Sequence, residues 1–317
     1  MYATSTRLRG EWGAVFRSTD DGAGGRWATL KRAVKFYGRL AMHRSSVEKC
    51  MASMHALGSA LGAHYPIEIC LRPLRPYLCR GLGATARVKC VVSHFHWLHT
   101  ALRPDVCRAL CQHQSLSIRL DVEGCADVAL VLRQSASQSR EGELSLDLFY
   151  KQQRLISATF SVVDTRAAAI DSPAPHSMLV AGFQGVRGTE QEVRELGASL
   201  QKLRPSALLL CAIQGLCAGW RLPAPVAVSH QNHVSASYAR KRRIQLDYDS
   251  VWAEAGSDRI APRYWQLPAA PLIRPDDQVP SKHRAQHRRR SALKSEFFET
   301  CRAAAALMAS NTTHTIE

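Results

Sequence analysis

The amino-acid sequence predicts an α+β protein, with a helical N-terminal part followed by a mixed, mainly antiparallel sheet that helices flank. Apolar residues recur at helical spacing up to about residue 114 and then alternate with a period of two in several short segments. After a glycine-bearing turn near residue 188, helical spacing returns and a short buried strand follows. With 317 residues, 46% of them hydrophobic, the chain can bury a large core.

Composition divides the chain into four parts. Residues 1–28 are rich in Gly, Ser and Arg and lack periodicity, so we expect a poorly ordered leader there. Residues 29–114 form the helical part, which a proline-rich connection interrupts. Residues 115–275 form the α+β domain, and residues 276–317 form a basic C-terminal helix and tail.

Five strands open the α+β domain. Their segments alternate apolar and polar residues or contain β-branched runs, and turn-like breaks such as ASQSREG and KQQ separate successive segments. Short connections of this kind join antiparallel neighbours, so we expect a meander. The predicted strands of the meander are 116–122, 126–134, 143–150 and 154–164, and residues 176–185 supply another strand.

Helices and short strands follow the meander. Thr189 and Glu192 fit a capping box, in which the hydroxyl bonds a backbone amide and the carboxylate reaches back, so a helix is expected from Thr189. A second helix begins at Pro205, because proline is favoured at the first helical position. The remaining predictions are a buried strand at 224–230, a helix at 247–256 and a strand at 263–268.

The chain is strongly basic, with 42 Lys and Arg residues against 26 Asp and Glu residues and a formal charge of +16. This balance favours anionic partners.

Residues 279–298 carry six Lys and Arg residues with no acid before Glu296, and we expect a helix that begins near Ser281 and packs through Leu293, Phe297 and Phe298. Such a helix either docks on the protein or lies on an anionic membrane surface. Nucleic acid is an unlikely partner, because stacking aromatic residues are absent from 279–296.

The ten cysteines form no CxxC pair and mostly have apolar neighbours, which indicates reduced, structural thiols. Cys107 and Cys111 are one helical turn apart and His113 follows, yet a second ligand pair at zinc spacing is missing, so we predict no metal site.

Neither a secretion signal after Met1 nor an apolar stretch of about 20 residues is visible. We therefore expect a cytoplasmic protein, or a peripheral one at the inner membrane.

Two groups of residues are candidates for chemistry. Gln184, Gly185, Arg187 and Gly188 place backbone amides and a cation at a helix start, which favours phosphate binding. The alternative is a purely structural turn.

The second group, His230, Asn232 and His233, follows a buried strand, where a neutral imidazole can accept a proton from an attacking amine or hydroxyl. The alternative is a polar loop whose side chains bond the backbone.

Four separated segments resemble, in their order and their amino-acid sequence, the VirK/YbjX family of bacterial proteins. They are LQKLRPSALLLCAIQGLCAGW, AVSHQNHV, DYDSVWAEAG and VPSKHRAQHRRR, and HYPIEICLRPLRPYL and VVSHFHWL extend the resemblance to about residues 64–295. The resemblance implies a role in envelope integrity, stress or virulence, without an established reaction.

A weaker likeness connects the C-terminal half with GNAT acyltransferases, because a glycine-bearing turn follows an antiparallel meander and precedes a buried strand. From Gln184 the chain reads Gln-Gly-Val-Arg-Gly, which departs from that family's usual spacing. The likeness implies an acyl-CoA or acyl carrier protein donor, an amine or hydroxyl acceptor, and a splayed strand pair beside residues 182 and 228 for a pantetheine arm. The alternative function is a noncatalytic basic protein that binds anionic membrane surfaces.

Overall fold

The computed structural model describes residues 26–61, 65–120, 127–135, 140–236 and 246–310. The predicted leader, residues 1–28, lies almost entirely outside this part of the chain. The N-terminal helices confirm the predicted succession of helix, irregular connection and helix. They are α2 (Arg26–Met42), α3 (Arg44–Leu61), α4 (Ile67–Cys70), the 3-10 turn η1 (Arg72–Leu74), α5 (Ala84–Ala101) and α6 (Pro104–Cys111).

The described strands form one sheet in the order β1-β2-β3-β4-β5-β6-β8-β7. Among these strands β5 and β6 are parallel and every other neighbouring pair is antiparallel, which confirms the predicted mixed, mainly antiparallel sheet. Strand β7 was not predicted, because its mostly exposed residues show no apolar alternation. The strands are β1 (Leu116–Arg119), β2 (Val128–Gln134), β3 (Leu144–Tyr150), β4 (Gln153–Asp164), β5 (His176–Gly185), β6 (Val226–Val228), β7 (Asp258–Ala261) and β8 (Tyr264–Gln266).

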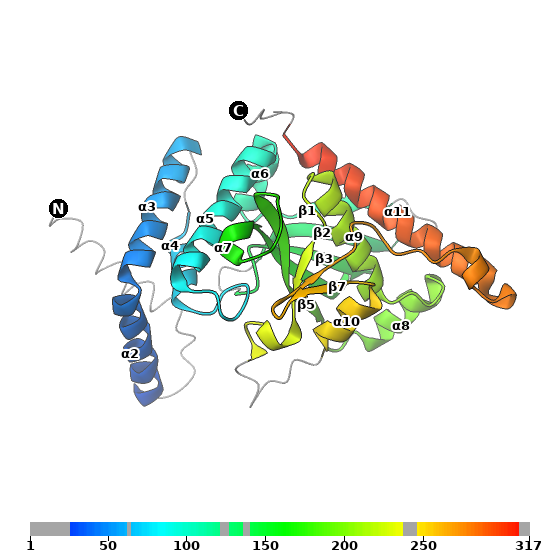
Figure 1. The fold of residues 1–317 in the computed structure, drawn as a ribbon, viewed down its shortest axis with the longest axis horizontal. Coiled ribbons are helices and arrows are strands. Elements are labelled where there is room, and N and C mark those ends of the chain that lie inside the picture. Colours follow the sequence, from blue (N-terminus) through cyan, green and yellow to red (C-terminus); the bar gives the residue numbers. More distant parts are fainter. Residues whose placement is uncertain (1–25, 62–64, 121–126, 136–139, 237–245, 311–317) are drawn as a thin grey trace.

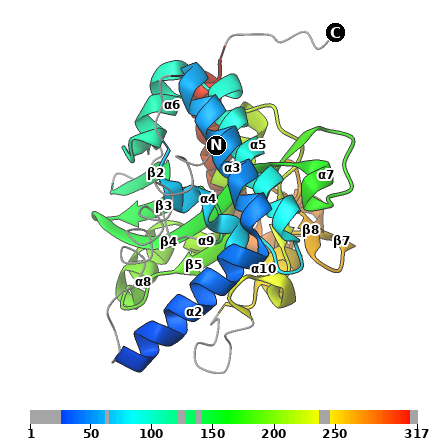
Figure 2. The ribbon, with the colours of Figure 1, turned by 90° about the vertical axis from the view of Figure 1, so that its left-hand side faces the viewer.

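The sheet lies between two groups of helices, with α2, α3 and α5 on one side and α9 and α11 on the other (Figures 1 and 2). One cluster of buried apolar side chains runs from Cys50 of α3 through Phe160 of β4 to Ala305 of α11. None of the described helices combines the length and apolar character needed to cross a membrane. The helical elements after β4 are α7 (Thr165–Ala168), α8 (Glu190–Ser199), α9 (Pro205–Gly219), η2 (His230–Asn232), α10 (Tyr248–Glu254), η4 (Asp276–Gln278), η5 (Ser281–His283) and α11 (Arg284–Met308).

The predicted basic helix, α11, packs along α9, the most apolar helix of the described chain. Two glycines of α9 permit the close approach, since a Cβ at Gly215 would overlap the Phe298 carbonyl and one at Gly219 would overlap the Arg302 carbonyl. Phe297 of α11 is fully buried, as predicted. The helix therefore docks on the protein with one face, although its N-terminal half carries many cations.

The end of α11 is tied to the corner between α5 and α6. The backbone amide of Arg103 donates to the carbonyl of Met308 over 2.9 Å, and the amide of Ser310 donates to the carbonyl of Ala101 over 2.8 Å. These bonds join an early and a late segment of the chain directly.

A buried ion pair links the N-terminal part to the sheet. Arg72 Nη2 lies 3.1 Å from Glu143 Oε2, and the Tyr77 hydroxyl donates to Glu143 Oε1 over 2.7 Å. All three residues are buried, so the charges compensate each other in a region from which water is excluded.

The start of α8 differs from the predicted capping box. The Thr189 hydroxyl donates to the carbonyl of Val186 over 2.8 Å and makes no capping bond to the helix. The preceding turn supplies a nearer acceptor than the helix backbone does, and a Thr hydroxyl readily makes such local bonds. Leu196 of the helix is buried and Val193 is half-buried, and the buried Leu200 and Leu203 follow the end of the helix.

Candidate functional site

The predicted phosphate turn lies at the end of β5, and some of its amides are already bonded. The Val186 amide donates to the Leu155 carbonyl over 2.9 Å, and the Gly188 amide lies 3.4 Å from Glu190 Oε1. Arg187 is exposed, and Gln184 and Gly185 pair with β4. The first turn of α8 carries Glu190 and Glu192, whose negative charge opposes an anion at this helix start.

The predicted catalytic residues lie on and next to η2, directly after β6. The His230 amide donates to Asp249 Oδ1 over 3.0 Å, and the His230 side chain is about one third exposed, at 36%. Asn232 Nδ2 donates to Ser229 Oγ over 3.0 Å and to the Pro262 carbonyl over 3.1 Å. Asn232 therefore fixes the turn, in agreement with the structural alternative for this residue.

His233 is fully buried and its ring orientation is fixed. The Ser235 amide donates to His233 Nδ1 over 3.2 Å, so the proton of the neutral ring resides on Nε2. That nitrogen lies 3.3 Å from Glu141 Oε1, although it is not aligned for a full hydrogen bond. Tyr248 packs edge-on against the ring, with 5.0 Å between centroids.

Glu141 brings one residue of each predicted group together. Gln184 Nε2 donates to both Glu141 oxygens, over 2.9 and 3.0 Å, while His233 approaches Oε1. The carboxylate fits against β5 because Gly182 has no side chain, and a Cβ there would overlap Glu141 Oε2. Glu141 was not predicted as a site residue, because it lies in a turn-like segment; the glycine at 182, inside a strand, was the signal for a close approach there.

Strands β5 and β6 pair over only two residues each, as a splayed strand pair would. Side chains of α10 bond to the two strands beyond these paired residues. Pairing is limited to Leu179 with Val226 and Val180 with Ala227. Beyond it, the Phe183 amide donates to the Tyr248 hydroxyl over 3.2 Å. Burial raises the pKa of Tyr248, which keeps the phenol protonated.

On the other strand of the pair, Trp252 Nε1 donates to the Val228 carbonyl over 3.0 Å. Backbone groups on both strands are thus already bonded where a pantetheine arm was predicted to lie.

A separate cavity of about 530 Å³ lies between α9, α10, α11 and the segment 271–274. Its size is within the range of ligand-binding pockets. The apolar part of its lining consists of Leu203, Ala207, Leu210, Val251, Ala255 and Leu272, of which Leu272 is exposed. The basic part of its lining consists of Lys202, Arg204, Arg274, His287, Arg290 and Lys294.

The cations of the lining differ in whether they already bond to other residues of the protein. Arg204 Nη1 lies 3.2 Å from the carboxylate of Glu254, which is the acidic residue in the lining of this cavity. Arg290 Nε donates to the Gln201 carbonyl over 2.6 Å. Lys202, Arg274 and Lys294 make no ion pair with the residues that the structure describes. The cavity therefore retains positive charge for a ligand.

A second cavity, of about 380 Å³, adjoins the first and shares Arg274, His287 and Arg290 with it. The basic segment 279–298 contributes to both cavities, and Arg284 Nε donates to the Val279 carbonyl over 3.0 Å. Several cations of the segment 279–298 therefore line these two adjoining cavities.

Helix α2 presents a further unusual surface. Phe36 and Leu40 pack against Val47 and Leu74, while the opposite face exposes large apolar side chains. Trp27 is 75% exposed and Val34 is 64% exposed, and the same face includes Leu30 and Tyr37. Lys31 and Lys35 are exposed on the same helix. An exposed apolar stripe with adjacent cations is typical of helices that lie in a membrane surface.

Comparisons with known proteins give a family and no activity. The family model described as protein of unknown function (DUF535) matches residues 25–303. The uncharacterized protein YbjX of Escherichia coli strain K12 is 24% identical over 224 residues, which cover 68% of this chain and 66% of YbjX.

Two uncharacterized proteins of Haemophilus influenzae also match. One is 25% identical over 171 residues, 53% of this chain and 54% of its own length. The other is 20% identical over 220 residues, 68% of this chain and 70% of its own length. The chain thus spans less than two thirds of the length of the first two relatives. No solved structure matches it significantly.

Proposed function

The chain belongs to the DUF535 family, in agreement with its VirK/YbjX resemblance, and from this premise we propose that it binds an anionic amphiphile in the cleft between α9, α10 and α11. An amphiphile of this class has an alkyl or acyl chain and a phosphate or carboxylate headgroup. The observation that carries the proposal is a cavity lined by both apolar and cationic side chains, with a single acid among them.

The two parts of the cleft suit the two parts of such a ligand. The apolar residues of the lining offer a surface for the hydrocarbon chain, and burial of such a chain contributes about 0.8 kcal/mol for each CH₂ group. Five Lys and Arg residues line the cleft against one acid, Glu254, which already pairs with Arg204. Cations without an internal partner bond an anionic headgroup more strongly than neutral donors do.

Helix α2 supports a location at the membrane surface, where such ligands reside. Its exposed Trp27 and Leu30 can enter the headgroup region of a bilayer, while Lys31 and Lys35 contact anionic lipids. Phe36 holds the opposite face of the helix on the protein, so insertion requires no exposure of the core. The role in envelope integrity, stress or virulence that the family resemblance implies stays a prediction.

The test is a calorimetric titration of the full chain with three probes below their micelle concentration. Lysophosphatidylglycerol is expected to bind, whereas lysophosphatidylcholine of equal chain length and glycerol phosphate alone are expected to bind much more weakly. Lys294→Glu is expected to weaken binding about tenfold or more. Arg289→Glu is the matched control, since Arg289 is exposed on the same helix and does not line the cleft.

Equal binding of the zwitterionic lipid would contradict the anionic specificity. Equal losses of affinity in Lys294→Glu and Arg289→Glu would show that the net charge of the protein, and not a specific site, determines binding.

Acyl transfer is the second candidate function, favoured by the contact between Glu141 and His233. Glu141 is partly accessible, with 19% of its side chain exposed, and Gln184 and His233 orient it. In this proposal Glu141 accepts the proton of an amine or hydroxyl that attacks the thioester of an acyl-CoA or acyl carrier protein. The C–S bond then breaks, and the departing thiolate takes up the proton. A pantetheine arm that pairs with Phe183 has to displace Tyr248, so donor binding requires movement of α10.

A thermal-shift series with acyl-CoA and acyl carrier protein tests this second function. Stabilisation by a donor and loss of product formation in Glu141→Gln are the expected results. Absence of a shift with every donor would remove acyl transfer, and it would leave amphiphile binding intact because the two sites share no residue.

A further inference from the structure

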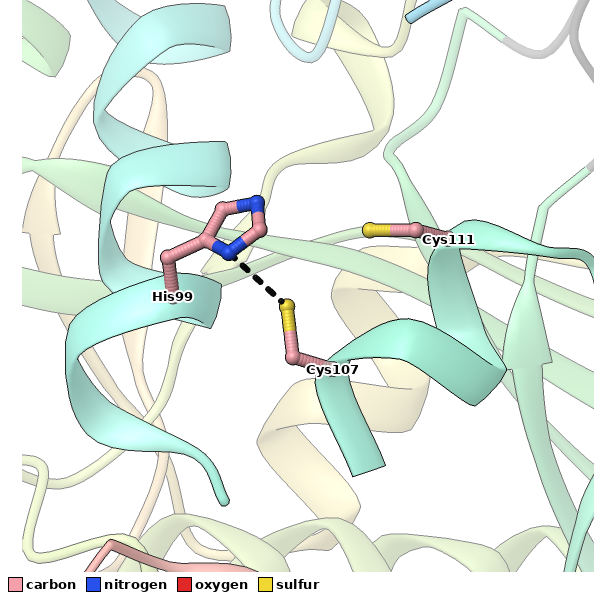
Figure 3. Close-up of side chains that lie close together, drawn as sticks. All are labelled: His99, Cys107 and Cys111. Carbon is pink, nitrogen blue, oxygen red and sulfur yellow. Dashed lines mark hydrogen bonds between the residues drawn. The ribbon is translucent and has the colours of Figure 1, made fainter. Parts of the chain in front are cut away.

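Three nitrogen and sulfur donors converge where α5 meets α6 (Figure 3). His99 lies near the end of α5, and Cys107 and Cys111 are one helical turn apart on α6. Each offers one ligand atom, and these atoms all lie within 4.8 Å of one another. The sequence spacing had suggested His113 as the histidine near the two cysteines. The structure places His113 at an exposed position beyond the end of α6, and the histidine beside the cysteines is His99.

The short connection between the helices fixes this arrangement. Helix α5 ends at Ala101 and α6 begins at Pro104, so only Leu102 and Arg103 separate them. Leu102 is buried, and Arg103 is bonded to the end of α11. The three donors are therefore supported by packed helices and not by a mobile loop, as a preformed site requires.

The orientation of His99 is set from its far side. Its Nε2 is hydrogen-bonded to the Tyr65 hydroxyl, while its Nδ1 lies 3.3 Å from Cys107 Sγ. Tyr65 is held in turn by Phe95, with 4.9 Å between ring centroids. Metal-binding histidines show this pattern, in which one nitrogen faces the metal and the other is bonded to a neighbouring group that fixes the ring.

The cluster is open to solvent on part of its surface, although Cys107 itself is buried. Cys111 is half-buried and His99 is also accessible, so solvent and ions reach the donors.

We propose that His99, Cys107 and Cys111 bind one Zn²⁺ ion, with a fourth position open to water or to an added ligand. Zn²⁺ prefers tetrahedral sites of nitrogen and sulfur donors, with bonds of about 2.0–2.1 Å to nitrogen and about 2.3 Å to sulfur. Tetrahedral angles then place donor atoms about 3.6–3.8 Å apart. The observed 3.3 Å between His99 and Cys107 is close to this value, so side-chain adjustments of about 1 Å or less complete the site.

Zinc at this corner would join the last turn of α5 to the first two turns of α6, next to the backbone bonds that hold the end of α11. Binding is therefore expected to stabilise the folded chain, because the unfolded chain cannot hold the three donors together.

The test uses the full chain, stripped with a chelator and kept reduced, in a calorimetric titration with Zn²⁺ and a spectroscopic titration with Co²⁺. One equivalent of Zn²⁺ is expected to bind and to raise the melting temperature. Co²⁺ is expected to give the visible absorption bands of a tetrahedral site and a near-ultraviolet sulfur-to-metal band. Cys111→Ser and His99→Gln are each expected to weaken binding at least about a hundredfold.

Two variants provide the controls. His113→Gln is expected to retain full affinity, because its side chain lies outside the cluster, and Tyr65→Phe is expected to lose about tenfold to a hundredfold through His99. Circular dichroism of each variant identifies any loss due to unfolding. Failure of the unaltered chain to bind one Zn²⁺, or unchanged binding in the double variant Cys107→Ser/Cys111→Ser, would overturn the proposal. Binding of Cu⁺ without Zn²⁺ would overturn the metal assignment.

Discussion

Glu141 Oε1 lies 3.3 Å from His233 Nε2, although four strands, β3 to β6, separate the two residues in sequence. Glu141 precedes β3, whereas His233 follows β6. The same carboxylate accepts two hydrogen bonds from Gln184 at the end of β5. One acid therefore connects three segments of the fold at the point where the parallel strands end.

This arrangement depends on the absence of a side chain at Gly182. Gly182→Ala is expected to displace Glu141 and to lower the free energy of unfolding by about 1–3 kcal/mol, measured by urea denaturation. Gly185→Ala on the same strand is the control, since its Cβ would make an ordinary contact 3.9 Å from the Leu155 carbonyl. Equal stability of the two variants would show that Glu141 moves without cost.

Stability is expected to fall in mild acid because of His94. Burial lowers the pKa of His94 to about 3, and its Nδ1 accepts a hydrogen bond from the Val162 amide over 3.1 Å. The unfolded chain protonates this imidazole at its ordinary pKa of about 6.5, so the unfolded state binds more protons below that pH. His94 therefore contributes full stability above about pH 6.5, and this contribution is lost progressively as the pH falls toward 3.

Between about pH 7 and about pH 5 the free energy of unfolding is expected to decrease by about 2 kcal/mol from this one group. Urea denaturation at both pH values measures the change. His94→Gln is expected to remove this part of the pH dependence, whereas His96→Gln, at an exposed position of the same helix, should retain it. An unchanged slope in the His94 variant would assign the effect to other groups.

The contact between α9 and α11 is expected to tolerate no added carbon. Gly215→Ala would place a Cβ on the Phe298 carbonyl and is expected to cost about 1–3 kcal/mol of unfolding free energy. Gly38→Ala on α2 is the matched control, because no atom lies within 4 Å of its added Cβ. That variant should gain about 0.5–1 kcal/mol from the better helix propensity of alanine, so the two substitutions should have opposite signs in thermal denaturation.

Binding to membranes is expected to depend on α2. Sedimentation with vesicles of phosphatidylglycerol and phosphatidylcholine should recover the protein at low salt and less of it at high salt. Trp27→Ala is expected to weaken the interaction roughly tenfold, since a bilayer would bury this exposed ring. Leu307→Ala tests specificity, because Leu307 is 73% exposed on α11. A similar loss in both variants, or binding to neutral vesicles alone, would exclude α2 as the docking element.

Features that depend on neighbouring residues were predictable from the sequence. The meander follows from short-range alternation and the start of α9 from its proline, and the structure confirms both. The capping box at Thr189 was wrong, because the hydroxyl has a competing acceptor in the turn before the helix.

Features that join distant segments could not be read from spacing. Lys294 and Leu203 line one cleft only because α11 folds back along α9. His99 meets the two cysteines only because a two-residue corner reverses the chain. Periodicity identifies which face of a helix is buried, but it does not identify the partner that covers that face.

The tie between α11 and the corner of α5 and α6 has a consequence for folding kinetics. The bond from Arg103 to Met308 closes a loop that includes every strand of the described sheet, so it cannot form early without a large loss of chain entropy. During synthesis, the helices around Arg103 leave the ribosome long before Met308 does. We therefore expect the backbone amides of Arg103 and Ser310 to acquire protection from hydrogen exchange only in a late phase of folding.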